Sequence, residues 1–385
     1  MKISKILMIE IIKDYSHHFG FNQITEPIEL CRIAKYIKER NEIKYDIEIL
    51  QVFSPEIDQI KNRVKLLCER DDDGLFFLIF NSKTIAFPDC ITISKKIKEF
   101  NIKTVNIFFG EYTESIVKHI YNNKGIDKKS TVVIEEMNIE GKNILDEILN
   151  DFDFIMHSEY ENSLSDILNY YENVIENNVD YKYNLNGVIL KKEGKYYITP
   201  ESEPVEKLTC IYDRSLIKDK KYYSSQVPPA PFDSNDEKKY EKMASIKIKE
   251  DCLNKCVNCL NIDSSGNETN ISNDKNLFDF IDKIYNYEKI KYFWFKGDYF
   301  FRNIYMNSEF LNKFIEFKNK NQEFYFNCKA DIKSISENIG NEILQKLKMA
   351  GCWSLILEIE YEFKNEEDAK QKKKIIEETF KEIYN

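Results

Sequence analysis

The feature that most constrains the fold of this chain is a regular alternation of apolar and amphipathic segments over residues 1–178. Residues 74–81, GLFFLIFN, form a nearly continuous apolar run, as expected of a strand buried on both faces of a parallel sheet. Residues 26–40 place Ile28, Cys31 and Ile37 on one face of a helix. Because such pairs recur about every 25–30 residues, the pattern predicts an α/β domain with a Rossmann-like, doubly wound parallel sheet.

The pattern changes twice in the rest of the chain. Residues 179–240 predict a connector that contains a β-hairpin, turning at Glu193–Gly194, and several prolines. From residue 241 the alternation resumes, and residues 241–385 predict about four β/α units. The strands expected there are 244–252, 291–300, 323–331 and 352–363.

The charge and the apolar segments exclude some classes of partner. The formal net charge of −10 argues against a nucleic acid or an anionic membrane surface as the main partner. No apolar run is long enough for a membrane span. The apolar start of the chain contains Glu10 and is followed by Lys13 and Asp14, which favours a buried strand over a leader peptide. We therefore expect a cytoplasmic protein, in which most of the nine cysteines are reduced.

Three of those cysteines, Cys252, Cys256 and Cys259, lie close together with the spacing C-x3-C-x2-C. Three thiolates on one loop can hold three irons of a [4Fe–4S] cluster, which leaves the fourth iron open to another ligand. A zinc site is the alternative, and it would need a fourth Cys or His ligand. All four histidines lie in the first predicted domain, so that ligand would be a distant residue such as Cys328. The other six cysteines are expected to be small buried hydrophobic residues.

The cysteine motif, placed directly after a predicted strand, resembles that of the radical S-adenosylmethionine (radical SAM) superfamily. The whole chain resembles the members in which a cobalamin (B12)-binding domain precedes the barrel, such as class B radical SAM methyltransferases. The matching segments are EPIELCRIAKYIKER, KTVNIFFGEYTES, DFDFIMHSEYENSLSDIL, NGVILKKEGKYYITP, KYFWFKGDYF and LKMAGCWSLILEIEYE. The resemblance implies a B12-binding-type first domain, a C-terminal partial (β/α) barrel, and a [4Fe–4S] cluster, S-adenosylmethionine and cobalamin as cofactors.

The resemblance also implies roles for single residues at strand ends. In the barrel it implies cofactor contacts for Asn258, Gly297 and Asp298, and a catalytic contact with ribose or substrate for Glu360. The barrel mouth is also expected to include Lys329, Asp331 and Glu358. In the first domain, where a doubly wound sheet binds its ligand at strand ends, the expected cobalamin contacts are Ser82, Thr84, Gly110, Glu111 and Glu159.

The chain departs from the family pattern at three points. Ser158 stands where a glycine normally precedes the conserved glutamate, and Asn258 replaces an aromatic residue before the third cysteine. The predicted β/α units after residue 240 are fewer than the family's barrel contains. We therefore expect a truncated barrel or one that a second chain completes.

Together these features predict a radical SAM enzyme that receives an electron from a donor and generates a 5′-deoxyadenosyl radical. Its substrate is an unidentified small molecule or peptide, and cobalamin-dependent methyl transfer is one chemistry that the resemblance implies. The alternative is a degenerate or truncated homologue that binds a ligand or a partner without catalysis.

Overall fold

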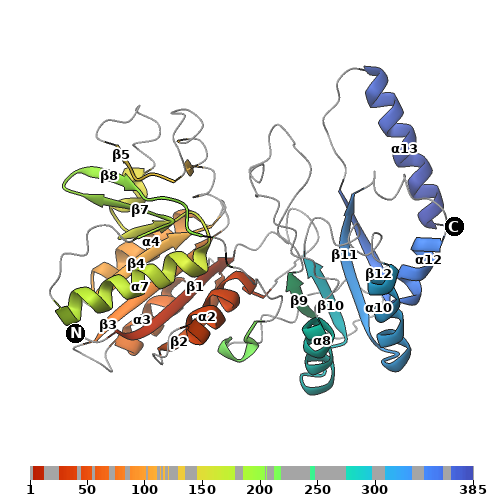
Figure 1. The fold of residues 1–385 in the computed structure, drawn as a ribbon, viewed down its shortest axis with the longest axis horizontal. Helices are drawn as coiled ribbons and strands as arrows, with labels where there is room; N and C mark the ends of the chain where they lie inside the picture. Colours follow the sequence, from red (N-terminus) through yellow and green to blue (C-terminus); the bar gives the residue numbers. More distant parts are fainter. Residues whose placement is uncertain are drawn as a thin grey trace. The chain divides into compact units, whose positions relative to one another are not determined.

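The structure, a computed structural model, divides into two compact units, each with its own sheet (Figure 1). The first unit comprises residues 1–22, 27–207 and 212–222, and the second comprises residues 23–26, 208–211 and 223–385. The structure describes residues 3–12, 26–40, 45–53, 57–68, 74–82, 87–100, 103–110, 113, 116–117, 120, 129–134, 145–177, 185–203, 205, 212–217, 243–247, 275–296, 308–331, 342–358 and 366–384.

The first unit alternates strands and helices close to the predicted positions. Its elements are β1 (Ile3–Ile12), α2 (Ile28–Arg40), β2 (Asp46–Phe53), α3 (Ile57–Cys68), β3 (Leu75–Ser82), α4 (Phe87–Lys98), β4 (Thr104–Phe109), β5 (Val132–Ile134), β6 (Phe154–Met156), α7 (Tyr160–Asn177), β7 (Val188–Lys192), β8 (Lys195–Ile198) and a short 3-10 helix (Arg214–Leu216).

The first sheet has eight strands in the order β2-β1-β3-β4-β6-β7-β8-β5. The strands from β2 to β6 pair in parallel, and β7, β8 and β5 extend the sheet with antiparallel pairs. The parallel strands have an order that doubly wound sheets also show, in which successive strands are added to one side of β1 up to β2 and to the other side from β3 onward. The prediction of an α/β chain with a parallel-rich sheet is confirmed.

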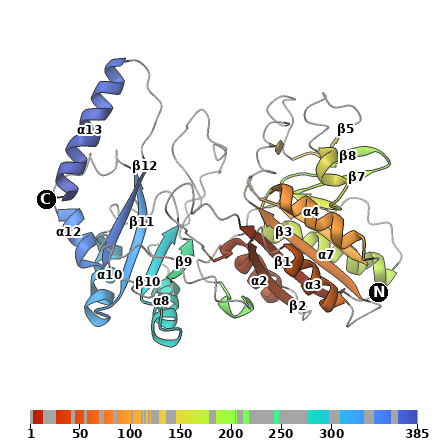
Figure 2. The same cartoon turned by 180° about the vertical axis from the view of Figure 1, so that it is seen from behind.

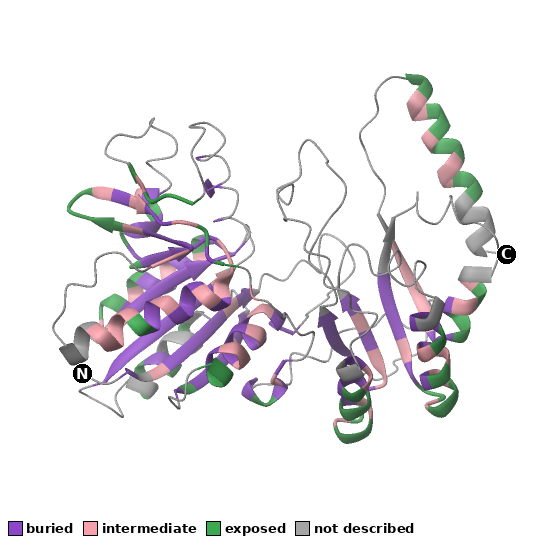
Figure 3. Ribbon diagram, in the orientation of Figure 1, coloured by how far each residue is buried: buried purple, intermediate pink, exposed green. Residues whose placement is uncertain are grey.

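Helices cover both faces of the parallel strands (Figures 1 and 2). α2 packs beside α7, and α3 packs beside α4. Side chains alternate along β1, so Ile9 and Ile11 join a core that includes Ile93 of α4, whereas Met8 faces the α2 and α7 side. Figure 3 shows these strands buried along most of their length, which explains the continuous apolar sequence of β3.

The predicted hairpin forms from β7 and β8 and turns through Glu193 and Gly194, whose φ angles are 50° and 77°. The adjoining edge strand β5 was not predicted from the sequence. It has three residues and pairs with β8, Val132 lying opposite Ile198. A strand this short has no periodicity of its own, and it forms because a distant partner is available.

Glu48, in the middle of β2, is a fully buried carboxylate. Its oxygens lie 3.1 Å from Nζ of Lys5 and 2.9 Å from Nη2 of Arg63. Burial raises the pKa of Glu48, but the hydrogen bonds and positive charges of Arg63 and Lys5 outweigh it and hold the pKa below its ordinary value. Ionised Glu48 therefore stabilises the folded state, and this contribution is lost as the pH falls through the lowered pKa.

We expect Glu48→Gln to lower the free energy of unfolding at neutral pH by about 3 kcal/mol, because Lys5, whose side chain is 12% exposed, loses its buried partner and keeps only the exposed Asp46. The difference from the wild type should shrink in acid, where Glu48 itself becomes protonated. The control is Asp46→Asn: Asp46 contacts the same Lys5 amine at 3.0 Å but is 64% exposed, and its loss should cost less than about 1 kcal/mol. Urea unfolding at several pH values measures both, and equal losses would contradict the prediction.

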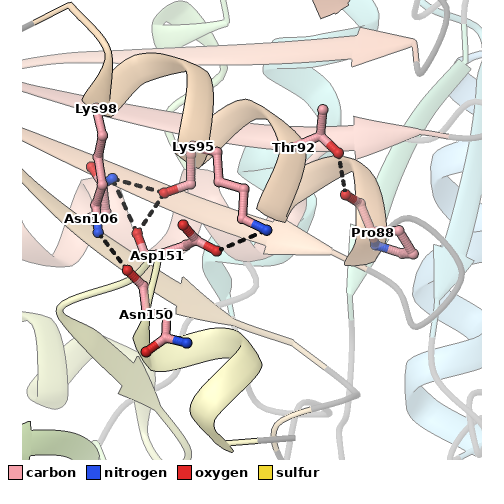
Figure 4. Close-up of polar contacts among 8 residues, drawn as sticks. Pro88, Thr92, Lys95, Lys98, Asn106, Asn150 and Asp151 are labelled. Carbon is pink, nitrogen blue, oxygen red and sulfur yellow. Dashed lines mark hydrogen bonds and ion pairs between the residues drawn. The ribbon is translucent and has the colours of Figure 1, made fainter.

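A second buried polar cluster joins α4 to the segment before β6 (Figure 4). The side-chain amide of Asn106 donates to Oγ of Ser94 at 2.8 Å, and Ser94 donates to the carbonyl of Asp151 at 2.6 Å. The main-chain N–H of Asn106 donates to the carboxylate of Asp153 at 2.7 Å, and the main-chain N–H of Asp153 donates to the carbonyl of Asn106 at 2.8 Å. These contacts fix how the chain enters β6.

The second unit also alternates strands and helices. Its elements are β9 (Met243–Lys247), α8 (Lys275–Tyr287), β10 (Tyr292–Lys296), α10 (Ser308–Lys320), β11 (Tyr325–Asp331), α12 (Glu342–Met349), β12 (Cys352–Glu358) and α13 (Glu366–Tyr384). Its four strands are parallel and follow one another across the sheet in chain order, from β9 to β12. Such an order is what successive β/α units with crossover helices produce.

One face of the second sheet packs against α10. Phe295 and Phe326 each contact Phe314 of α10 with ring centroids 5.3 Å apart, and all three rings are buried. Tyr292 and Tyr325 alternate with these residues along β10 and β11 and therefore lie on the other face, where their rings stack at 5.4 Å. In the described part of the chain, no helix is both long and apolar enough to cross a membrane.

Candidate functional site

The site residues predicted in the first unit that the structure describes lie at one edge of its sheet. Ser82 ends β3, Gly110 follows β4, and Glu159 lies between β6 and α7. β3, β4 and β6 are parallel neighbours, so their carboxyl ends share the edge at which doubly wound sheets bind ligands. Thr84 and Glu111 lie outside the described residues, as does the side chain of Ser82.

The end of β4 turns through Gly110, whose φ of 139° favours glycine. Thr113 closes this turn, since its N–H and its hydroxyl both donate to the carbonyl of Gly110, at 3.0 and 2.7 Å. The same hydroxyl lies 3.2 Å from the carbonyl of Met156, the last residue of β6. Thr113 therefore joins two neighbouring strand ends. Thr113 was not predicted as a site residue from the sequence, although a hydroxyl residue just past a strand end was the available signal.

The end of β6 is tied to the segment that follows the hairpin. Oγ of Ser158 accepts the N–H of Ser202 at 3.0 Å, and the carboxylate of Glu159 accepts the N–H of Val205 at 3.3 Å. Glu159 has a φ of 36°, and α7 begins at the next residue. Ser158, which stands where the family pattern has glycine, thus uses its hydroxyl to hold the chain at residue 202.

Gly187 packs against this strand end. Its φ is 68°, and a Cβ on it would lie 2.1 Å from Oγ of Ser163, 2.5 Å from Oγ of Ser202 and 2.8 Å from the carbonyl of Ser158. Ser163 also donates to that carbonyl at 2.6 Å. Position 187 therefore has no room for a side chain.

Two further polar residues lie near the point at which the strand order reverses, beside β1. Glu10 of β1 and Gln51 of β2 are register partners near the carboxyl ends of their strands. Nε2 of Gln51 donates to the carboxylate of Glu10 at 2.6 Å. Neither residue was predicted as a site residue from the sequence, although a polar residue near the end of an otherwise apolar strand was the available signal.

In the second unit, the four parallel strands end at one edge of their sheet. Lys247 and Lys296 are register partners near that edge, and so are Asp331 and Glu358. The segment that contains the three cysteines follows β9. The predicted site residues that lie outside the described residues are Cys252, Cys256, Cys259, Asn258, Gly297, Asp298 and Glu360.

Within the described ranges, no group of three or more His, Cys, Asp or Glu residues could hold a metal ion. The donor set of the cysteine segment, three thiolates at C-x3-C-x2-C spacing, fits an iron–sulfur cluster with one open iron. A hollow of about 370 Å³ on α8 is lined by Asp279, Asp282, Lys283 and Tyr287, none of which is a predicted site residue.

Comparison with known proteins gives a likeness in fold. No family model and no curated protein matches this sequence. The apo structure of OxsB, a cobalamin-dependent S-adenosylmethionine radical enzyme, is similar with a TM-score of 0.52 and 13% sequence identity. The match covers 99% of this chain and 47% of that chain, so this chain spans about half the length of OxsB. At this identity the likeness concerns the fold.

Proposed function

We propose that this chain is a radical SAM enzyme in which Cys252, Cys256 and Cys259 hold a [4Fe–4S] cluster. The observation that carries the proposal is their spacing, directly after the first strand of a parallel sheet whose strands follow in chain order. All four strands are parallel and therefore end at the same edge, which is where the catalytic groups of barrel enzymes lie. The fold likeness to OxsB supports the same assignment.

The finer roles in the second unit extend this proposal. When bound, the cluster supplies the electron that cleaves S-adenosylmethionine into methionine and a 5′-deoxyadenosyl radical. Asn258, Gly297 and Asp298 contact S-adenosylmethionine, and Glu360 contacts ribose or substrate. Their places in the chain support these roles, since Gly297 and Asp298 follow β10 directly and Glu360 lies just beyond β12. The substrate is a small molecule or a peptide, and a donor supplies the electron.

Cobalamin is the second cofactor that we propose, with methyl transfer as the chemistry it adds. It binds at the carboxyl edge of the first sheet, where the predicted contacts are Ser82, Thr84, Gly110, Glu111 and Glu159. Two observations support this edge: the strand order reverses there, and Gly110 leaves the end of β4 without a side chain, so a flat ring can approach the backbone. Ser158 and Glu159 contribute by holding residues 202 and 205 beside that edge.

Anaerobic reconstitution with iron and sulfide tests the proposal. We expect about four irons per chain, and 5′-deoxyadenosine after reduction in the presence of S-adenosylmethionine. A visible spectrum of the protein purified with cobalamin tests the second cofactor. A four-iron cluster without 5′-deoxyadenosine would favour the alternative, a homologue that binds without catalysis, and zinc in place of iron would refute both.

A further inference from the structure

A row of uncharged polar side chains crosses the second sheet. Ser245, Trp294, Asn327 and Ser354 are successive register partners on β9, β10, β11 and β12. Trp294 and Asn327 alternate with Phe295 and the other rings that pack on α10, so the row belongs to the face turned away from that helix. We call these four residues the polar row.

The residues on one side of the polar row have a different chemistry. Towards the amino ends of the strands, Tyr292 stacks on Tyr325, and the ring of Trp353 lies 6.3 Å from that of Tyr292. This face therefore changes from aromatic near the amino ends of the strands to uncharged and polar at the polar row.

Asn327 is the residue of the polar row that most requires an explanation. It is 5% exposed, and its Oδ1 accepts no hydrogen bond from any residue that the structure describes. Ser245, two strands away in the polar row, is also buried, and its main-chain N–H donates to the carboxylate of Glu26 at 2.9 Å. A buried amide oxygen without a partner destabilises the fold, and such groups in folded proteins usually mark a position that something else completes.

We propose that the polar row binds an uncharged hydrogen-bond donor of the substrate, a hydroxyl or an amide N–H, with Oδ1 of Asn327 as the acceptor. This inference rests on the proposed function and names the substrate class for that site. The donor is uncharged because none of the four side chains of the polar row is charged, and the nearby carboxylate of Glu26 lies at Ser245, two strands away from Asn327. The aromatic rings of Tyr292, Tyr325 and Trp353, which lie towards the amino ends of the strands, suit an apolar part of the same substrate.

Stability is the first test, because a ligand-binding amide and a structural amide respond oppositely to an apolar replacement. Asn327→Leu should raise the melting temperature of the full chain by about 2 °C, since it removes an unpaired buried oxygen. The control, Asn106→Leu, should lower it by about 5 °C or more, because Ser94 and Asp151 would lose a donor. If Asn327→Leu melts below the wild type or fails to fold, Asn327 is structural and the proposal is overturned.

Binding is the second test, and the chain carries its own reporter. Its two tryptophans, Trp294 and Trp353, both lie on this face, so tryptophan fluorescence reports on it. Acetamide can donate an N–H to Asn327, whereas N,N-dimethylacetamide cannot. We expect a saturable change with acetamide in the millimolar range, weakened about fivefold or more in Asn327→Leu and Asn327→Ala, and none with the dimethyl compound.

The same response to both amides, or the same response in wild type and variants, would overturn the proposal. Neither measurement requires the cluster or S-adenosylmethionine. A failure here is therefore distinct from a failure to form 5′-deoxyadenosine, which would overturn the proposed function itself.

Discussion

Replacing Cys252, Cys256 and Cys259 together by alanine should reduce the iron bound after anaerobic reconstitution from about four atoms per chain to less than about one. The cluster needs all three thiolates, because each holds one iron and the fourth iron is left for the cofactor. Production of 5′-deoxyadenosine should fall to background in the same variant. Iron and sulfide assays together with electron paramagnetic resonance of the reduced protein measure the loss.

Cys328 provides the matched control, because a zinc site would require it or a similarly distant residue as fourth ligand. Cys328 is fully buried. It is the register partner of Phe295 on β10, so both side chains lie on the face of the sheet that packs against α10. Burial raises the pKa of the Cys328 thiol, and neighbouring Cys352 raises it further. A thiol that stays protonated is a poor metal ligand, so Cys328→Ala should keep its full iron content. Loss of metal from that variant would contradict the iron–sulfur assignment and favour zinc.

The sequence predicted those parts of the fold that depend on residues close to one another along the chain. The apolar run of β3 reflects burial on both faces, and the hairpin depends on Gly194 at a position with positive φ. No local pattern in the sequence predicted that Glu48, in the middle of β2, would be buried. That carboxylate is stable there because Lys5 and Arg63, from two other elements, lie within reach. Such partners are set by the order of strands and helices in space, which no local pattern contains.

The same distinction applies to the candidate site. The rule that ligands bind at the carboxyl ends of parallel strands was enough to select Gly110 and Glu159, which the structure places at one edge. Thr113 was missed because its importance comes from reaching the end of β6, which neighbours β4 only in the folded sheet. Asn327 was missed because a single asparagine in a strand is unremarkable until the register aligns it with Trp294 and Ser354.

Gly187→Ala should be the most destabilising single methyl addition at the sheet edge, lowering the free energy of unfolding by about 4 kcal/mol. Two effects add: a φ of 68° strains any residue with a Cβ, and that Cβ would meet Oγ of Ser163 at 2.1 Å and the carbonyl of Ser158 at 2.8 Å. The control is Gly194→Ala, whose φ of 77° gives the same strain but whose Cβ would meet nothing within 4 Å. It should cost about 1 kcal/mol.

Urea unfolding followed by circular dichroism separates the two contributions, since the difference between the two glycine variants is the steric part. The double variant Ser163→Ala with Gly187→Ala should recover some of the loss, because it removes the nearest atom, while Ser202 and the Ser158 carbonyl still obstruct the new Cβ. Equal losses at positions 187 and 194 would mean that packing at the end of β6 is loose. In that case, the contacts that Ser158 and Glu159 make to residues 202 and 205 could not hold the edge where we place cobalamin.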